Sequence, residues 1–196
     1  MRKGTETKTA IRKEALAAAS QVGLENLTIG NLAKSLGMSK SGLFSHFTSK
    51  ESLQIEVLNE AEELFINNVI LPALKEPRGE ARLRKLFERW LNWDQQKFLP
   101  GGCIFITAAT EFDDQPGPLR DRVAEVQSNW FAFIARAARI AQEEGQFRAD
   151  LDDEQFAYEF FSIALGYHMV SRLLKDPKAK QRFTTALEDL FKRSRN

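Results

Sequence analysis

The chain has 196 residues, 43% of them hydrophobic, which is enough to bury a core in one or two compact units. Its single cysteine excludes an intrachain disulfide, as is usual in a reducing cytosol. The first ten residues are polar, so they are not a secretory signal, and no apolar run approaches the ~20 residues that span a bilayer. A cytoplasmic protein without a membrane partner is therefore expected.

The formal net charge of +1 is distributed unevenly along the chain. Residues 1–55 contain eight Lys or Arg against four Asp or Glu, whereas residues 56–196 contain 20 against 23. A basic N-terminal part suits contact with nucleic acid phosphates. Residues 1–8 are expected to form a flexible basic arm with Arg2, Lys3 and Lys8, which either touches DNA or is simply disordered.

Two helices are predicted first. Apolar residues recur at helical spacing over residues 9–22, and Gly23 ends that helix. The second helix covers residues 29–36, with Thr28 as its N-cap. Gly37 ends it, because glycine adopts the left-handed conformation that other residues resist.

A third helix is predicted over residues 40–47, with Ser39 as its N-cap. Leu43 and Phe47 form its inner face, and its outer face carries Ser41, Gly42, Phe44, Ser45 and His46. A helix, a turn containing glycine and a second short helix form the helix-turn-helix pattern. No Asp or Glu occurs between Leu27 and Lys50, so this surface would not repel phosphates. An ordinary helical hairpin with solvated turns is the alternative.

This stretch resembles the N-terminal domain of the tetracycline-repressor (TetR) family of bacterial transcriptional regulators. The matching residues are Thr28, Ile29, Leu32, Ala33, Gly37, Met38, Ser39, Lys40, Leu43, Phe47, Ser49, Lys50, Glu51 and Leu53, with Ile11, Ala15, Ala19 and Gly23 upstream. Two positions depart from the family. Phe44 replaces a Tyr that often bonds a phosphate, and Gly42 stands where many members have Thr or a similar side chain.

The resemblance implies a homodimer that binds a double-stranded DNA operator through residues 1–50. Residues 51–196 would form a larger domain for dimerisation and for a small-molecule inducer that releases the DNA. The residues expected at the DNA are Thr28, Ser39, Lys40, Ser41, Gly42, Phe44, Ser45, His46 and Lys50. Lys50 is expected to contact a phosphate.

Further helices are predicted over residues 50–71, 80–96, 103–112, 118–144, 152–174 and 178–193, separated by Pro- and Gly-containing breaks. No strand-type alternation of any length occurs, so the fold class is all-α. The helix over residues 50–71 contains no Gly or Pro and would be about 30 Å long. It would join the two domains without a flexible linker.

Aromatic residues on several helices of the larger part are candidates for a ligand pocket: Trp93, Phe105, Phe112, Trp130, Phe160 and Tyr167. Plain core packing is the alternative for each. The last two helices are apolar enough to pair across a two-fold axis into a four-helix bundle, or to close the core of the monomer.

Cys103 follows two glycines at a helix start, where the dipole favours a reactive thiolate. It is a candidate sensor of electrophiles or oxidants, or a small buried residue. His46, His168 and Cys103 are too scattered for a metal site, and no catalytic motif appears. No enzyme activity, metal or cofactor is therefore expected. A larger domain that binds a protein partner is the other reading of the function.

Overall fold

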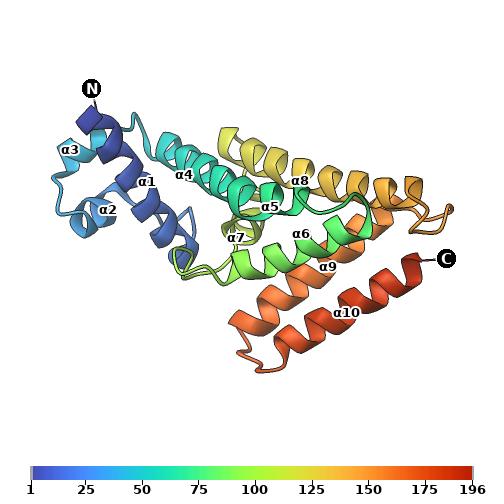
Figure 1. Cartoon of the computed structure of the whole chain (residues 1–196). Coiled ribbons are helices and arrows are strands. Elements are labelled where there is room, and N and C mark those ends of the chain that lie inside the picture. The colour runs from blue at the N-terminus through green and yellow to red at the C-terminus, as the bar shows by residue number, and fades with distance from the viewer. Residues whose placement is uncertain (1, 196) are drawn as a thin grey trace. The chain divides into compact units, whose positions relative to one another are not determined.

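The computed structural model describes the backbone of residues 2–195, and the side chains of residues 7–195 other than Phe44. Every regular element in this part of the chain is helical, which confirms the all-α prediction (Figure 1). In chain order the elements are α1 (Arg2–Val22), α2 (Ile29–Ser35), α3 (Lys40–Phe44), α4 (Lys50–Phe65), the π-helix η1 (Ile66–Ile70), α5 (Leu71–Leu74), α6 (Glu80–Asp94), α7 (Ile104–Phe112), α8 (Pro118–Glu143), α9 (Asp153–Arg172) and α10 (Ala179–Ser194). None of the described helices is both long and apolar enough to cross a membrane.

The contacts divide the chain into two compact units. The first unit consists of residues 1–66 and 95–126, and the second of residues 67–94 and 127–196. The predicted boundary at residue 50, between a DNA-binding and a ligand-binding domain, stays a prediction.

Helix α1 is the centre of the first unit. It packs against α2, α4 and α7. Its buried stripe consists of Ile11, Ala15, Leu16 and Ala19, and residues of α2, α3 and α4 complete the core: Leu32, Ala33, Leu43, Leu53, Val57, Leu58 and Ala61. Burying one Leu or Ile side chain contributes about 1.5–3 kcal/mol, so this core holds the three short N-terminal helices together.

The N-terminal arm expected over residues 1–8 is wrong as a description of the backbone, since α1 already begins at Arg2. The side chains of Arg2 and Lys3 lie outside the described residues. Lys8 is held by α4, because its Nζ lies 2.6 Å from Oε1 of Glu56 and 5.6 Å from the ring centroid of Phe47. These contacts to distant parts of the chain anchor the early turns of α1.

The long helix predicted over residues 50–71 is interrupted in its hydrogen-bonding pattern. It is α-helical from Lys50 to Phe65, π-helical over Ile66–Ile70 and α-helical again from Leu71 to Leu74. Pro72, which was expected in a loop, lies in the first turn of α5, directly after the π-helical turn, and as a proline it donates no backbone hydrogen bond there. The helical path is therefore three residues longer than predicted, and less regular.

Aromatic rings form the centre of the second unit. Phe87 of α6 stacks on Phe160 of α9, with ring centroids 3.9 Å apart, and Phe156 and Phe191 pack against the same ring of Phe87. Helices α9 and α10 lie side by side and antiparallel (Figure 1). Aromatic pairs in such geometries add about 0.5–1.5 kcal/mol each beyond the area that they bury.

One cluster of charges ties α1 to α4. Oε2 of Glu56 lies 3.3 Å from Nη1 of Arg12, and Nε of Arg12 lies 3.1 Å from Oε2 of the buried Glu60. Burial raises the pKa of Glu56, but hydrogen bonds and charges from Lys8 and Arg12 outweigh it and hold that pKa below 4.5. The folded state therefore binds fewer protons at Glu56 than the unfolded chain does. The resulting stability is present above pH 4.5 and is lost as the pH falls through the folded pKa.

We expect Glu56→Gln to lower the melting temperature at pH 7 by about 2–4 °C, as the loss of roughly 1 kcal/mol would in a chain of this size. The difference from the wild type should close as the pH is lowered below about 4.5, when the wild-type carboxylate also becomes neutral. Thermal melts between pH 3 and 7 measure this. Glu14→Gln, at an exposed position of α1, is the control. A difference that is the same at every pH would contradict the assignment.

Candidate nucleic-acid interface

The turn between α2 and α3 is fixed by local hydrogen bonds. Oγ1 of Thr28 accepts from the backbone N–H of Asn31 (3.1 Å), and Oγ of Ser39 accepts from that of Gly42 (3.0 Å). Gly37 has φ +62°, and the N–H of Met38 donates to the carbonyl of Ala33 (2.9 Å). Both predicted N-caps and the glycine stop are confirmed.

The inner face of this pair of helices is buried and the outer face is open. Leu32, Leu43 and Phe47 are buried against α1 and α4. Most of the polar residues proposed for DNA contact are exposed: Thr28, Ser39, Lys40, Ser41 and Ser45. Gly42 and His46 are half-buried, and the side chain of Phe44 lies outside the described residues. The backbone of α3 ends at Phe44, three residues earlier than predicted, because a tight turn bonds the N–H of His46 to the carbonyl of Leu43.

Two glycines shape this surface. A Cβ at Gly42 would lie 3.1 Å from Oγ of Ser39, so a larger residue there would crowd the N-cap of α3. A Cβ at Gly30 of α2 would lie 3.3 Å from Cε of Lys40. The aliphatic part of the Lys40 side chain therefore lies close to α2 at its only glycine. The glycine at position 42 therefore leaves room for the N-cap of α3.

Lys50 has a partner inside the protein. Its Nζ donates to the backbone carbonyl of Glu25 (2.5 Å) and lies 3.6 Å from the Glu25 carboxylate, while 42% of the side chain stays exposed. Its expected phosphate contact stays a prediction. Sequence reasoning missed Asn31 and Lys34, which are exposed on α2 beside the buried Leu32 and Ala33. Their positions on the helix relative to Leu32 and Ala33 could have predicted that their side chains are exposed.

The six aromatic candidates for a ligand pocket do not form one cluster within either unit. In the second unit, the ring centroids of Trp130 and Phe160 are 6.3 Å apart, and Trp90 lies 5.8 Å from Phe160 and 6.1 Å from Tyr167. Trp90 therefore belongs to the same group of rings as Trp130, Phe160 and Tyr167, although it was not among the six candidates. Trp93 is fully buried in the same unit. In the first unit, Phe105 packs edge-on against Phe65, and Phe112 is buried.

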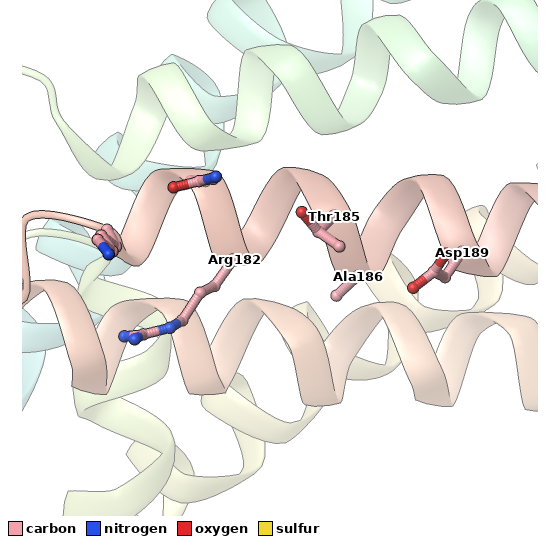
Figure 2. Close-up of a pocket in the computed structure, with 6 residues that line it drawn as sticks. Arg182, Thr185, Ala186 and Asp189 are labelled. Atoms are coloured by element: carbon pink, nitrogen blue, oxygen red, sulfur yellow. The ribbon is translucent and has the colours of Figure 1, made fainter.

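A shallow, open hollow lies on the outer face of α10. It is lined by Gln181, Arg182, Thr185, Ala186 and Asp189 of that helix and by its N-cap Lys178, and it contains none of the aromatic candidates (Figure 2). Five of these six residues are polar, and Arg182 forms an ion pair with Asp176. Such an open, one-sided surface does not enclose a small molecule.

Cys103 is the N-cap of α7 and only 2% exposed. That burial favours a packing role, and the sensor role stays a hypothesis. Nδ1 of His168 lies 2.8 Å from Oδ1 of Asp94, a carboxylate that is 2% exposed. The half-buried His168 therefore has a carboxylate partner inside the protein.

The comparisons with known proteins agree with this architecture. Residues 11–57 match the family model of bacterial regulatory proteins of the tetR family, and residues 79–187 match that of the tetracyclin repressor-like C-terminal domain. No curated protein sequence matches the chain significantly.

Solved structures share the fold at low sequence identity. A TetR transcriptional regulator from Chloroflexus aurantiacus has a TM-score of 0.90 and 23% identity, over 100% of this chain and 99% of that one. A transcriptional regulator from Saccharomonospora viridis in complex with choline has a TM-score of 0.82 and 20% identity, over 98% and 99%. AibR, in complex with isovaleryl coenzyme A and operator DNA, has a TM-score of 0.76 and 20% identity, over 94% and 97%.

The two family models together cover the α2–α3 pair and most of the helices that follow it. Both models describe bacterial regulators of the tetracycline-repressor type. This chain is a member of the TetR family of bacterial regulatory proteins.

Proposed function

We propose that the chain is a ligand-responsive repressor of the bacterial cytoplasm. Two copies bind a near-palindromic operator through α2 and α3, and a small molecule bound in the C-terminal domain releases them. The observation that carries this proposal is the α2–α3 pair, which is capped, anchored on its inner side and free of carboxylates on its outer side. AibR, which has the same fold, was solved with both an operator and a small molecule.

The charge pattern supports DNA as the partner. Residues 1–55 carry a net charge of +4, and Lys34 and Lys40 are exposed on α2 and α3. Small side chains on α3 (Ser41, Gly42 and Ser45) leave room for the backbone to approach the edges of bases in the major groove. An acidic surface would repel the phosphates.

The test is selection of bound duplexes from a random double-stranded library by the purified full-length protein. We expect the selected sequences to be near-palindromes whose half-sites lie one helical turn or more apart. Recovery of no preferred sequence at low salt would contradict sequence-specific DNA binding.

Lys40→Ala should weaken binding to the selected duplex and lower the slope of log K against log salt by about one unit, because one phosphate contact is lost. Fluorescence anisotropy at several salt concentrations measures the slope. Lys75→Ala removes the same charge at an exposed position beyond α5 and should leave the slope unchanged. An unchanged slope in Lys40→Ala would remove Lys40 from the contacts.

A stripe of large apolar side chains on α9 supports the homodimer. Tyr158, Leu165, Met169 and Leu173 are 60%, 48%, 53% and 75% exposed, and their spacing places them along one face of the helix. Exposed apolar patches of this kind mark interaction sites. The outer face of α10, with Thr185 and Ala186, also lies open in the single chain (Figure 2). A second copy would bury both faces around a two-fold axis.

Met169→Glu should therefore shift the protein from dimer to monomer, because a carboxylate in that interface would be buried without a partner. Sedimentation velocity measures the mass. The control is Thr184→Glu, which adds the same charge at an exposed position on α10 outside the proposed interface. A Met169→Glu protein that remains dimeric would place the interface elsewhere.

The inducer site is proposed at the aromatic cluster of Trp90, Trp130, Phe160 and Tyr167, where the half-buried Trp130 is the most accessible member. Choline and isovaleryl coenzyme A, the ligands of two relatives, are the first compounds to test. A compound that raises the melting temperature of the wild type and releases the duplex should lose both effects in Trp130→Ala. Retention of both effects would exclude this cluster.

A further inference from the structure

The connection between α1 and α2, residues 23–28, is held from two sides within the first unit. On one side, Oε2 of Glu111 in α7 accepts a hydrogen bond from the N–H of Leu24 (2.8 Å). On the other side, Nε2 of Gln54 donates to the carbonyl of Leu24 (2.7 Å) and Nζ of Lys50 to that of Glu25 (2.5 Å). Helices α7 and α4 therefore both bond the backbone of Leu24, α7 at its N–H and α4 at its carbonyl.

The backbone at this point leaves room for the Glu111 carboxylate. Gly23 follows the last residue of α1 with φ +85°, in the left-handed region that favours glycine. A Cβ on Gly23 would lie 1.6 Å from Oε1 of Glu111. Glycine is thus required here twice, for its φ and for the space that the carboxylate fills.

The segment leading into α7 is fixed to the same end of α1. The N–H of Gly101 donates to Oγ of Ser20 (3.1 Å), and a Cβ on Gly101 would lie 1.5 Å from the backbone oxygen of Ser20. With Glu111 near the end of α7 and Gly101 before its start, α7 is attached to α1 at two points. A displacement of α7 therefore displaces the connection.

The ionised carboxylate at this site costs the fold some stability. Burial raises the pKa of Glu111, and Glu25 in the connection adds to that effect, while the N–H groups of Leu24 and Glu25 and the charge of Lys50 oppose it. Because the folded pKa lies above the unfolded one, the ionised form is the less favourable one at neutral pH. A neutral side chain that accepts hydrogen bonds would avoid this cost.

We infer that Glu111 is a positioning residue for DNA binding: through its hydrogen bond to Leu24 and its contact with Gly23, α7 sets the path of the α1–α2 connection and with it the placement of α2 and α3. This inference rests on the proposed function. Without the hydrogen bond from Glu111, the connection is bonded to α4 alone. Helices α2 and α3 then occupy a wider range of orientations, and fewer of them match the groove.

The test compares Glu111→Gln with the wild type and with Asp114→Asn, which removes one negative charge at an exposed position three residues away. A glutamine keeps the shape of the side chain but turns one acceptor into a donor that faces a backbone N–H. We expect the affinity for the selected duplex to fall about fivefold or more, as for a typical coupling between sites. Hydrogen exchange should become faster at Leu24 and Glu25 and across α2 and α3.

The melting temperature of Glu111→Gln relative to the wild type should rise between pH 4.5 and 7, since only the wild type acquires the buried charge. A merely structural role would instead lower stability and affinity together. The inference is overturned by an affinity within twofold of the wild type, by exchange that does not change at Leu24 and Glu25, or by equal effects of Asp114→Asn. Should the wild type select no duplex, the proposed function fails, whereas the exchange experiment still decides whether Glu111 positions α2 and α3.

Discussion

The packing of α1 is the constraint on which the rest of the first unit depends. Its small residues Ala15 and Ala19 are fully buried, so neighbouring helices approach its backbone closely. Helices α2, α4 and α7 all contact it. A shift of one of these three helices is passed through α1 to the other two, because a close-packed core has little free volume to absorb the shift.

Charged side chains also fix how the packed helices are oriented relative to one another. Lys8 and Arg12 of α1 pair with Glu56 and Glu60 of α4, and Arg122 of α8 bonds Asn59 and Glu62 of the same helix. Exposed ion pairs contribute little stability, but a guanidinium with several fixed partners defines the rotation of one helix about another. Helix α4 is consequently held by charged side chains at several points along its length.

Short-range features were predictable from the sequence, and long-range ones were not. The N-caps Thr28 and Ser39, the stop at Gly37 and the apolar stripe of α1 follow from neighbouring residues, and the structure has them. Lys8 of α1 pairs with Glu56 of α4, and Glu111 bonds the N–H of Leu24, 87 residues away. No local pattern contains such pairings. For the same reason Trp90 was missed, since its ring contacts come from α9 and α10.

The π-helical turn at Ile66–Ile70 has a consequence for how this helix tolerates changes in length. In a π turn each N–H bonds the carbonyl five residues back, so the turn contains one residue more than an α-helical turn. Removal of a single residue from this segment would restore the ordinary pattern and leave the faces of α4 and α5 in register. Elsewhere in a helix the same deletion would rotate everything downstream by about 100°. This segment is therefore where a chain of this fold can gain or lose one residue without rebuilding the core on either side.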